Sequence, residues 1–420
     1  MHKTVRPSKK QRASRVTPAR KLAFSVLEDI RCHKVFLEQA WNRGAKALSL
    51  PPAEKAFARL LATEVVSRRG SLDILINRVL KSPDDIQDDV RNALRISFVE
   101  LFYLNKPAHV VSHEGVELVR SFAPKAAGVA NFALRRACEQ KTEFPFGNIH
   151  SDVSAASLYF GFPQWLTQKL IDEFGFDSAF HFMENSNCSA PLFFIINQAH
   201  ANGPQTLKSL VNQGIKIFPL PRIQQKDCGL SCFLFAQRSD VGNEFVIDLL
   251  RKGSLVISDG AAQKVASLAV PDCFPGRFLE IGAGRGTKSL LLQNVALSRF
   301  GKQMALDTLD VDQSRTKERI SRLKQADIVQ NEVFCQDATH LSHFSDATYD
   351  AVFIDAPCTG VGTLRRHVDI RWRVTEHEIS AMAEKGLTML KQAARLVKPG
   401  GFLTYATCTL FKEENEQVIE

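Results

Sequence analysis

The chain has 420 residues, of which 45% are hydrophobic, and its formal net charge is +9. This length and this hydrophobic content predict a globular protein of two or three domains with packed cores. No apolar run approaches the roughly 18 residues that cross a membrane, and no signal-peptide core is present, so neither membrane insertion nor export is indicated. Nine cysteines at irregular spacing indicate reduced thiols in a cytoplasmic protein and not a disulfide framework.

Basic residues gather at the N-terminus, and residues 1–20 contain no acidic residue. A segment of this composition cannot form a packed core, so residues 1–16 are predicted to be a basic disordered tail. The tail is either a solubilising segment or an arm that grips RNA. The overall positive charge favours a polyanionic partner.

Residues 17–138 show the hydrophobic spacing of amphipathic helices, and no convincing strand interrupts them. Thr17-Pro18 is typical of a helix start, with a capping hydroxyl followed by proline. These residues are predicted to form an all-helical domain of roughly five to seven helices. Residues 139–157 lack the spacing and are rich in turn formers, which predicts a linker.

Residues 158–257 predict a small α+β subdomain. Its helices are expected at 162–173 and 204–213, and its strands at 193–197, 215–218, 232–236 and 255–257. Cys228 and Cys232 have the spacing of half a zinc site, but no second pair accompanies them, so no metal is predicted. Residues 258–420 are predicted to be an α/β domain.

A glycine-rich turn follows the predicted strand Phe278–Ile281. Gly282, Gly284 and Gly286 have the spacing G-x-G-x-G, which differs from the G-x-G-x-x-G of dinucleotide-binding domains and disfavours a dehydrogenase. With Glu280 just before the turn, the pattern fits an S-adenosylmethionine site better.

Acidic residues stand at the ends of successive predicted strands. Asp310 ends the second strand, where a carboxylate can accept hydrogen bonds from both ribose hydroxyls of a nucleoside, and Asp307 is the competing register. Asp337 follows the third strand, and Asp355 ends the buried run 349–354. Their recurrence at strand ends argues against coincidence.

Two cysteines also follow strands directly. Cys358 comes just after Asp355, and Cys408 follows the apolar run 401–406. Free cysteine is usually a buried and inert residue, but these two leave strand ends and are flanked by small or hydroxyl residues. We therefore expect both thiols to face one crevice at the carboxyl edge of the sheet.

These phrases resemble a known family. DAPCTGVGTLRRHVDIRW (355–372) and YATCTLFKEEN (405–415) resemble the two cysteine motifs of the RsmB/Sun family of RNA 5-methylcytosine methyltransferases. ARKLAFSVLEDI (19–30) and AGVANFALRR (127–136) resemble the NusB-like domain that precedes the catalytic part in bacterial members. The resemblance implies an all-α NusB-like bundle, a small RNA-recognition-like subdomain and a Rossmann-like class I methyltransferase domain. Family members continue in an antiparallel hairpin, so the last strands of the sheet are expected to be missing here. Either the sequence is a fragment or the edge of its sheet is completed in another way.

The resemblance also implies roles for individual residues. S-adenosylmethionine is the expected cofactor, and the residues expected to bind it are Glu280, Gly282, Gly284, Gly286, Asp310, Asp337 and Asp355. Cys408 is expected to attack carbon 6 of a cytosine and Cys358 to assist release of the enzyme. Asp355 and Lys288 are expected to hold the base. The residues expected to contact RNA phosphates are Arg365, Arg366 and Arg371.

The function implied is 16S rRNA (cytosine-5-)-methyltransferase in a cytoplasmic protein that is expected to be a monomer without metal. An enzyme acting on tRNA or another RNA would share the motifs of the catalytic half. A non-catalytic RNA-binding or assembly factor would keep the basic helical domain. The NusB-like domain favours small-subunit rRNA as the partner.

Overall fold

The structure is a computed structural model that describes residues 16–201, 203–219 and 232–420. Most of the predicted basic tail and Cys228 lie outside the described residues. The chain divides into two compact units. The first extends to Cys188 and also contains Thr363–Val374, and the second comprises Ser189–Gly362 and Thr375–Glu420.

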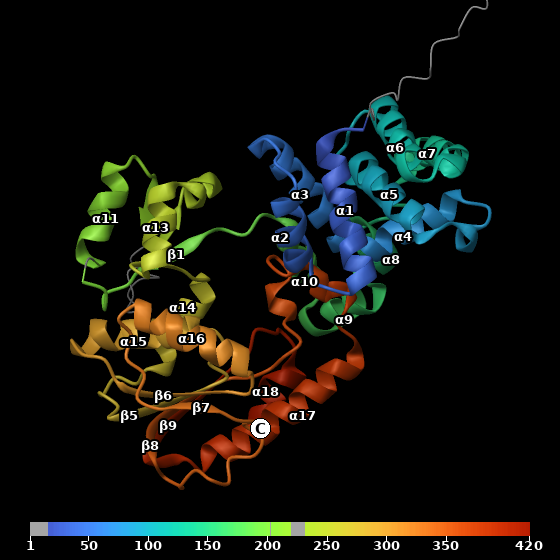
Figure 1. Cartoon of the computed structure of the whole chain (residues 1–420). Coiled ribbons are helices and arrows are strands. Elements are labelled where there is room, and N and C mark those ends of the chain that lie inside the picture. Colours follow the sequence, from blue (N-terminus) through green and yellow to red (C-terminus); the bar gives the residue numbers. More distant parts are fainter. Residues whose placement is uncertain (1–15, 202, 220–231) are drawn as a thin grey trace, which may run out of the picture. The chain divides into compact units, whose positions relative to one another are not determined.

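The first unit is helical (Figure 1). Its helices are α1 (Pro18–His33), α2 (Leu37–Ala47), α3 (Pro52–Ser67), α4 (Arg69–Val79), α5 (Asp88–Phe98), α6 (Ala108–Phe122), α7 (Ala127–Gln140), α8 (Val153–Phe160), α9 (Gln164–Phe174) and α10 (Phe176–Asn187). Pro18 occupies the first turn of α1, and Leu22 and Val26 are buried on the predicted apolar face. A buried ion pair joins the Arg20 guanidinium to Glu100, with Nη2 lying 2.6 Å from Oε1. The predicted all-helical domain is confirmed.

The second unit contains a small antiparallel sheet in the order β2-β3-β1-β4. Its elements are β1 (Phe193–Ile196), α11 (Gly203–Asn212), β2 (Ile217–Pro219), β3 (Cys232–Phe235), α13 (Glu244–Lys252) and β4 (Leu255–Ile257). Among the described residues, this β-α-β-β-α-β order is the split βαβ arrangement of ferredoxin-like domains. Phe194, Leu210 and Val246 are buried together between the sheet and its helices.

A five-stranded parallel sheet in the order β7-β6-β5-β8-β9 forms the rest of the second unit. Its strands are β5 (Arg277–Ile281), β6 (Ala305–Asp310), β7 (Val333–Cys335), β8 (Tyr349–Asp355) and β9 (Val397–Ala406). Its main helices are α14 (Gly260–Ala269), α15 (Thr287–Phe300), α16 (Gln313–Gln325) and α17 (Glu376–Ala394), and α18 (Glu416–Ile419) follows β9.

Both faces of this sheet are covered, as the continuous apolar strands require. Phe278 packs with Leu291 of α15 and Leu323 of α16, whereas the next residue of β5, Leu279, packs with Met389 of α17. Figure 1 accordingly shows α14, α15 and α16 on one face and α17 on the other. The order of strands reverses between β5 and β8, and open α/β sheets bind ligands at such a switch point.

The structure divides the chain differently from the predicted ranges. Residues 158–188 form helices of the first unit, although they were predicted to open the small α+β subdomain. The predicted linker, residues 139–157, contains the start of α8. Helix α13 was not predicted, and β9 begins four residues before the predicted run 401–406. Within the described residues, no helix is long and apolar enough to span a membrane.

Candidate active site

The glycine-rich turn joins the carboxyl ends of β5, β6 and β8. Gly282 adopts φ of 81°, and a Cβ there would lie 2.3 Å from the carbonyl oxygen of Asp355, so only glycine fits. The amide of Gly284 donates to Asp310 Oδ2 at 2.7 Å. The main chain of the turn therefore packs directly against the strand ends that carry the predicted acids.

The structure places Asp310, and not Asp307, at the glycine turn. Asp310 is the last residue of β6, whereas Asp307 lies three residues earlier and its carboxylate accepts hydrogen bonds from Arg277 Nε at 3.0 Å and Asn331 Nδ2 at 2.7 Å. Asp337 follows β7, and its carboxylate accepts from the amide and the hydroxyl of Thr339, which lower its pKa. Asp310 is thus the acid of β6 that lies at the glycine turn.

Glu280 is a fully buried carboxyl group at the base of the turn. Neither of its carboxylate oxygens has a hydrogen-bond partner among the described residues. Burial raises its pKa to about 7, and the nearby hydroxyl of Ser289 and the guanidinium of Arg319 only partly oppose this shift. Arg319 donates to the carbonyl oxygen of Gly284 at 2.9 Å. An orphaned carboxylate beside a glycine cradle fits a cofactor that carries an amino group and hydroxyls, as S-adenosylmethionine does.

This shift predicts that replacing Glu280 with glutamine stabilises the cofactor-free protein in a pH-dependent way. The folded pKa of about 7 exceeds the ordinary 4.5, so the unfolded chain loses its proton first and the free energy of unfolding falls as pH rises from 4.5 to 7. The advantage of Glu280→Gln over the unchanged protein should grow across that window to at most about 3 kcal/mol.

Urea unfolding at pH 5 and pH 8 measures the difference. The matched control is Glu416→Gln, because Glu416 is exposed. Equal differences for Glu280→Gln at both pH values would show that the buried carboxyl titrates normally.

Lys288 and Asp355 meet at the switch point. Lys288 lies in the first turn of α15 and Asp355 ends β8, and Lys288 Nζ lies 2.7 Å from Asp355 Oδ2. Both side chains are about one-quarter exposed, at 25% and 28%. A cation and an anion with exposed edges can therefore bind the polar edge of one flat ligand.

The two cysteines face each other across the ends of β8 and β9. Cys358 Sγ lies 3.1 Å from Cys408 Sγ, and the amide of Cys408 donates to Cys358 Sγ at 3.2 Å. These donors lower the pKa of Cys358, and the proton that Cys408 shares with that sulfur raises the pKa of Cys408. The pair therefore titrates as one unit that holds a single proton in its intermediate state.

The three predicted phosphate contacts are not equivalent. Arg371 is fully buried: its Nη1 donates to Asn187 Oδ1 at 3.0 Å, and its guanidinium lies 4.1 Å from the ring centre of Phe162. Burial lowers its pKa to about 9. The prediction that Arg371 contacts RNA is wrong, because its charge is enclosed by the first unit. Arg365 is half-buried and donates to the carbonyl oxygen of Cys188 at 3.2 Å, whereas Arg366 is exposed.

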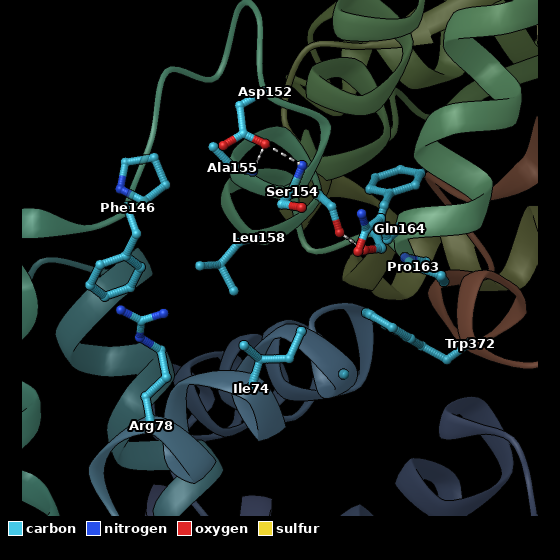
Figure 2. A pocket seen from close by; sticks show the side chains of 14 residues that line it. Ile74, Arg78, Phe146, Asp152, Ser154, Ala155, Leu158, Pro163, Gln164 and Trp372 are labelled. Atoms are coloured by element: carbon cyan, nitrogen blue, oxygen red, sulfur yellow. Dashed lines mark hydrogen bonds between the residues drawn. The ribbon is translucent and has the colours of Figure 1, made fainter.

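Trp372 also anchors in the first unit. Its indole Nε1 donates to the carbonyl oxygen of Ser67 at 2.8 Å, and its ring lies over Gly70. Trp372 lines a cavity of about 340 Å³ together with Ile74, Arg78 and other residues of this unit (Figure 2). The aromatic residue after a predicted phosphate contact is therefore a packing anchor.

Sequence reasoning missed Glu414 as a residue of the site. It is buried, and its carboxylate accepts hydrogen bonds from the residues that follow each cysteine, Thr359 and Thr409. The available signal was the repeated Cys-Thr pair, since two identical hydroxyls at two strand ends predict a shared acceptor.

A doubly covered parallel sheet, a glycine turn against acid-tipped strands and an orphaned carboxylate define a class I S-adenosylmethionine-dependent methyltransferase. Comparison with known proteins then identifies two domains by family. Residues 275–420 match the family of the 16S rRNA methyltransferase RsmB/F, and residues 17–139 match the NusB family. Residues 275–420 therefore carry an RsmB/F-type methyltransferase domain, and residues 17–139 carry a NusB domain.

Relatives match over most of the chain. Ribosomal RNA small subunit methyltransferase B of Xanthomonas campestris pv. campestris is 29% identical, over 88% of this chain and 79% of the relative. A probable ribosomal RNA small subunit methyltransferase B of Bacillus subtilis is 24% identical, over 96% of this chain and 87% of the relative.

Solved structures share the fold. The crystal structure of PH0851 has a TM-score of 0.74 at 21% identity and covers 97% of this chain and 89% of its own. NSun6 from Pyrococcus horikoshii, solved with the S-adenosylmethionine analogue SFG, has a TM-score of 0.51 at 15% identity and covers 61% of this chain and 86% of its own.

Within the described residues, no group of three or more His, Cys, Asp or Glu side chains could hold a metal ion.

Proposed function

We propose that the chain methylates carbon 5 of a cytosine in small-subunit rRNA through a covalent bond between Cys408 and the base. The observation that carries this proposal is the pair of sulfurs 3.1 Å apart at the ends of β8 and β9. The ion pair of Lys288 and Asp355 lies at the same edge of the sheet. A single catalytic thiol would need no such partner.

The chemistry of cytosine explains why a thiolate is needed. Carbon 5 becomes nucleophilic only after a nucleophile adds to carbon 6, and a thiolate is the strongest nucleophile among side chains at neutral pH. Cys408 passes its proton to the thiolate of Cys358 and forms the sulfur–carbon 6 bond as the double bond between carbons 5 and 6 opens. Carbon 5 then takes the methyl group, which S-adenosylmethionine supplies when it is bound.

The remaining residues hold the base and complete the reaction. Asp355 accepts hydrogen bonds from the N3/N4 edge of cytosine, and these bonds stabilise the charge that develops on the base. Lys288 orients Asp355 and the base. Loss of the carbon 5 proton to solvent water then restores the ring double bond and expels Cys408 as thiolate. Cys358 assists this elimination.

The cofactor site of this proposal uses the residues around the glycine turn. Asp310 accepts from the ribose hydroxyls, Asp337 lies toward the adenine, and the buried Glu280 faces the donors of the methionine part. The residues that complete the cradle are Gly282, Gly284, Gly286 and Asp355. The glycine turn supplies close main-chain approach, and the start of α15 adds positive potential.

RNA is the macromolecular partner, in the cytoplasm where ribosomal RNA is found. The target cytosine must be unpaired or flipped from its helix to reach the thiols. Arg365 and Arg366, which immediately follow the Cys358 loop in the chain, hold neighbouring phosphates in this proposal. The NusB domain and the named relatives favour rRNA over tRNA.

Bisulfite mapping of RNA from a strain that lacks this protein tests the substrate. We expect one small-subunit rRNA cytosine to lose its bisulfite resistance and to regain it when the protein is restored. Loss at a tRNA cytosine instead would transfer the activity to tRNA. Failure of the purified chain to bind S-adenosylmethionine in calorimetry would favour a non-catalytic RNA-binding factor.

A further inference from the structure

Each of the two cysteines is followed by a threonine, and the two threonine hydroxyls meet. Thr359 Oγ1 lies 3.1 Å from Thr409 Oγ1. Both hydroxyls also reach one carboxylate oxygen, Glu414 Oε2, at 2.6 Å from Thr359 and 2.8 Å from Thr409. The second oxygen, Oε1, accepts from the amide of Thr359 at 2.7 Å. A single carboxylate thus binds the residue after each thiol.

Further hydrogen bonds fix the loop of Cys408 on its other side. Thr407, the residue before Cys408, donates from its hydroxyl to Asn415 Oδ1 at 2.6 Å. The amide of Gly362 donates to the carbonyl oxygen of Cys408 at 3.0 Å. Glu414 ends a short 3-10 helix, and Asn415 is the next residue. Glu414 therefore holds Thr409 and Asn415 holds Thr407, the two threonines that flank Cys408.

Burial of the Glu414 carboxylate costs free energy unless the carboxylate accepts hydrogen bonds. Glu414 is 1% exposed, and a buried carboxylate without hydrogen bonds is strongly unfavourable. Its three donors from the two thiol loops are neutral groups, and hydrogen bonds to an ionised acceptor are about twice as strong as neutral ones. Separating the loops would take at least one of these donors from the buried carboxylate, so the carboxylate penalises any geometry in which the sulfurs part.

We propose that Glu414 is a positioning residue that clamps the Cys358 and Cys408 loops together and so keeps the two sulfurs within proton-sharing distance. The catalytic consequence rests on the proposed function, because only a two-thiol mechanism needs this distance. Glu414 acts through Thr359 and Thr409 and does not itself touch the base.

Glu414→Gln tests the clamp with nearly unchanged shape. One amide oxygen cannot accept all three hydrogen bonds, so we expect kcat for RNA methylation to fall about 10- to 100-fold while KM for RNA and affinity for S-adenosylmethionine stay unchanged. The matched control is Glu416→Gln, two residues along and exposed, which should keep full activity. An unchanged kcat for Glu414→Gln would overturn the proposal.

The threonines provide a second test that survives if Glu414→Gln does not fold. Thr409→Val removes the hydroxyl at nearly constant volume, whereas Thr409→Ser keeps it. We expect Thr409→Val to lower kcat about tenfold and Thr409→Ser to retain it. Equal losses in both variants would assign the effect to packing and overturn the clamp.

A pH profile separates positioning from simple stabilisation. The negative charge of Glu414 raises the pKa of Cys358, against the donors that lower it. Removing that charge should move the acidic limb of the kcat profile to lower pH, which a loss of folded protein would not do. An unshifted profile in a folded Glu414→Gln variant would contradict the charge effect.

Thiol alkylation distinguishes failure of this inference from failure of the proposed function. Iodoacetamide labelling of Cys358 and Cys408, followed by mass spectrometry, reads the thiol pair without any RNA. We expect Glu414→Gln to change the ratio of labelling at the two cysteines by at least about threefold, because the shared proton is released. An unchanged ratio overturns the clamp, whereas absence of RNA methylation by the unaltered protein with a changed ratio overturns only the proposed function.

Discussion

Replacing Cys408 with alanine should abolish methyl transfer, with a rate loss of at least about a thousandfold. Without the sulfur no bond to carbon 6 forms, and carbon 5 of cytosine stays unreactive. Cys358 Sγ lies 3.1 Å from Cys408 Sγ, but in the proposed mechanism Cys358 takes up a proton and does not replace Cys408 as the nucleophile. Transfer of a labelled methyl group from S-adenosylmethionine to substrate RNA measures the loss.

Replacing Cys358 with alanine should have the opposite signature. Bond formation by Cys408 remains possible, but elimination loses its assisting group, so the protein should accumulate bound to RNA. A protein–RNA band that survives denaturing electrophoresis is the expected readout. The double variant Cys358→Ala with Cys408→Ala should show no such band.

Another cysteine provides the control for these variants. Cys273 is an exposed free cysteine in the same unit, ahead of β5, and Cys273→Ala should keep full activity and form no band. A stable RNA complex with Cys408→Ala and none with Cys358→Ala would exchange the two roles. That outcome would fit the lowered pKa of Cys358, which favours its thiolate in the resting protein.

The predicted and observed structures agree where local pattern decides position. Asp310 and Asp355 end buried strands and Cys408 follows the partly exposed edge strand β9, and parallel strands bring such residues to one edge. The hydrophobic period of an element and the end of a strand depend on neighbouring residues in the sequence. The fold class and the crevice could therefore be predicted. The choice between Asp307 and Asp310 needed the register of β6 against the glycine turn.

Tertiary packing decides the features that sequence reasoning missed. Arg371 lies in an exposed-looking basic phrase, yet Phe162 and Asn187, about two hundred residues earlier, enclose its guanidinium. Glu414 lies in an acidic phrase typical of a solvated helix start, yet two loops fifty residues apart bring hydroxyls onto it. The hydrophobic periodicity of the sequence cannot predict the burial of Arg371 or Glu414, because both are buried by contacts between distant segments.

Tertiary packing also decides to which unit the segment 363–374 belongs. It follows the Cys358 loop in the chain but belongs to the helical unit. Asp369 accepts a hydrogen bond from the amide of Leu37 at 3.0 Å, and the Trp372 indole donates to Ser67. A few buried contacts at its end therefore attach this segment to the helical unit, which a division by sequence pattern could not detect.

Replacing Gly70 with alanine should detach this anchor. Gly70 lies in the first turn of α4, and a Cβ there would be 2.2 Å from Cζ3 of Trp372 and within 2.8 Å of two further ring atoms. An indole ring cannot yield as the end of a flexible side chain can, so the ring must leave its place over the helix. Figure 2 shows Trp372 on the same side of the cavity as Pro163 and Gln164, with Ile74 and Leu158 between it and Arg78.

The expected cost is about 1–3 kcal/mol of unfolding free energy, the range for overpacking a buried contact. Helix propensity alone predicts the reverse sign, because alanine is favoured over glycine inside a helix by about 1 kcal/mol. Gly128 is the matched control: it lies in α7, and a Cβ there meets no atom within 4 Å. Gly128→Ala should therefore be neutral or stabilising.

Urea unfolding gives the sign of each change, and hydrogen exchange at residues 363–374 should speed up in Gly70→Ala alone. Equal stability of the two variants would mean that the indole is free to move from Gly70.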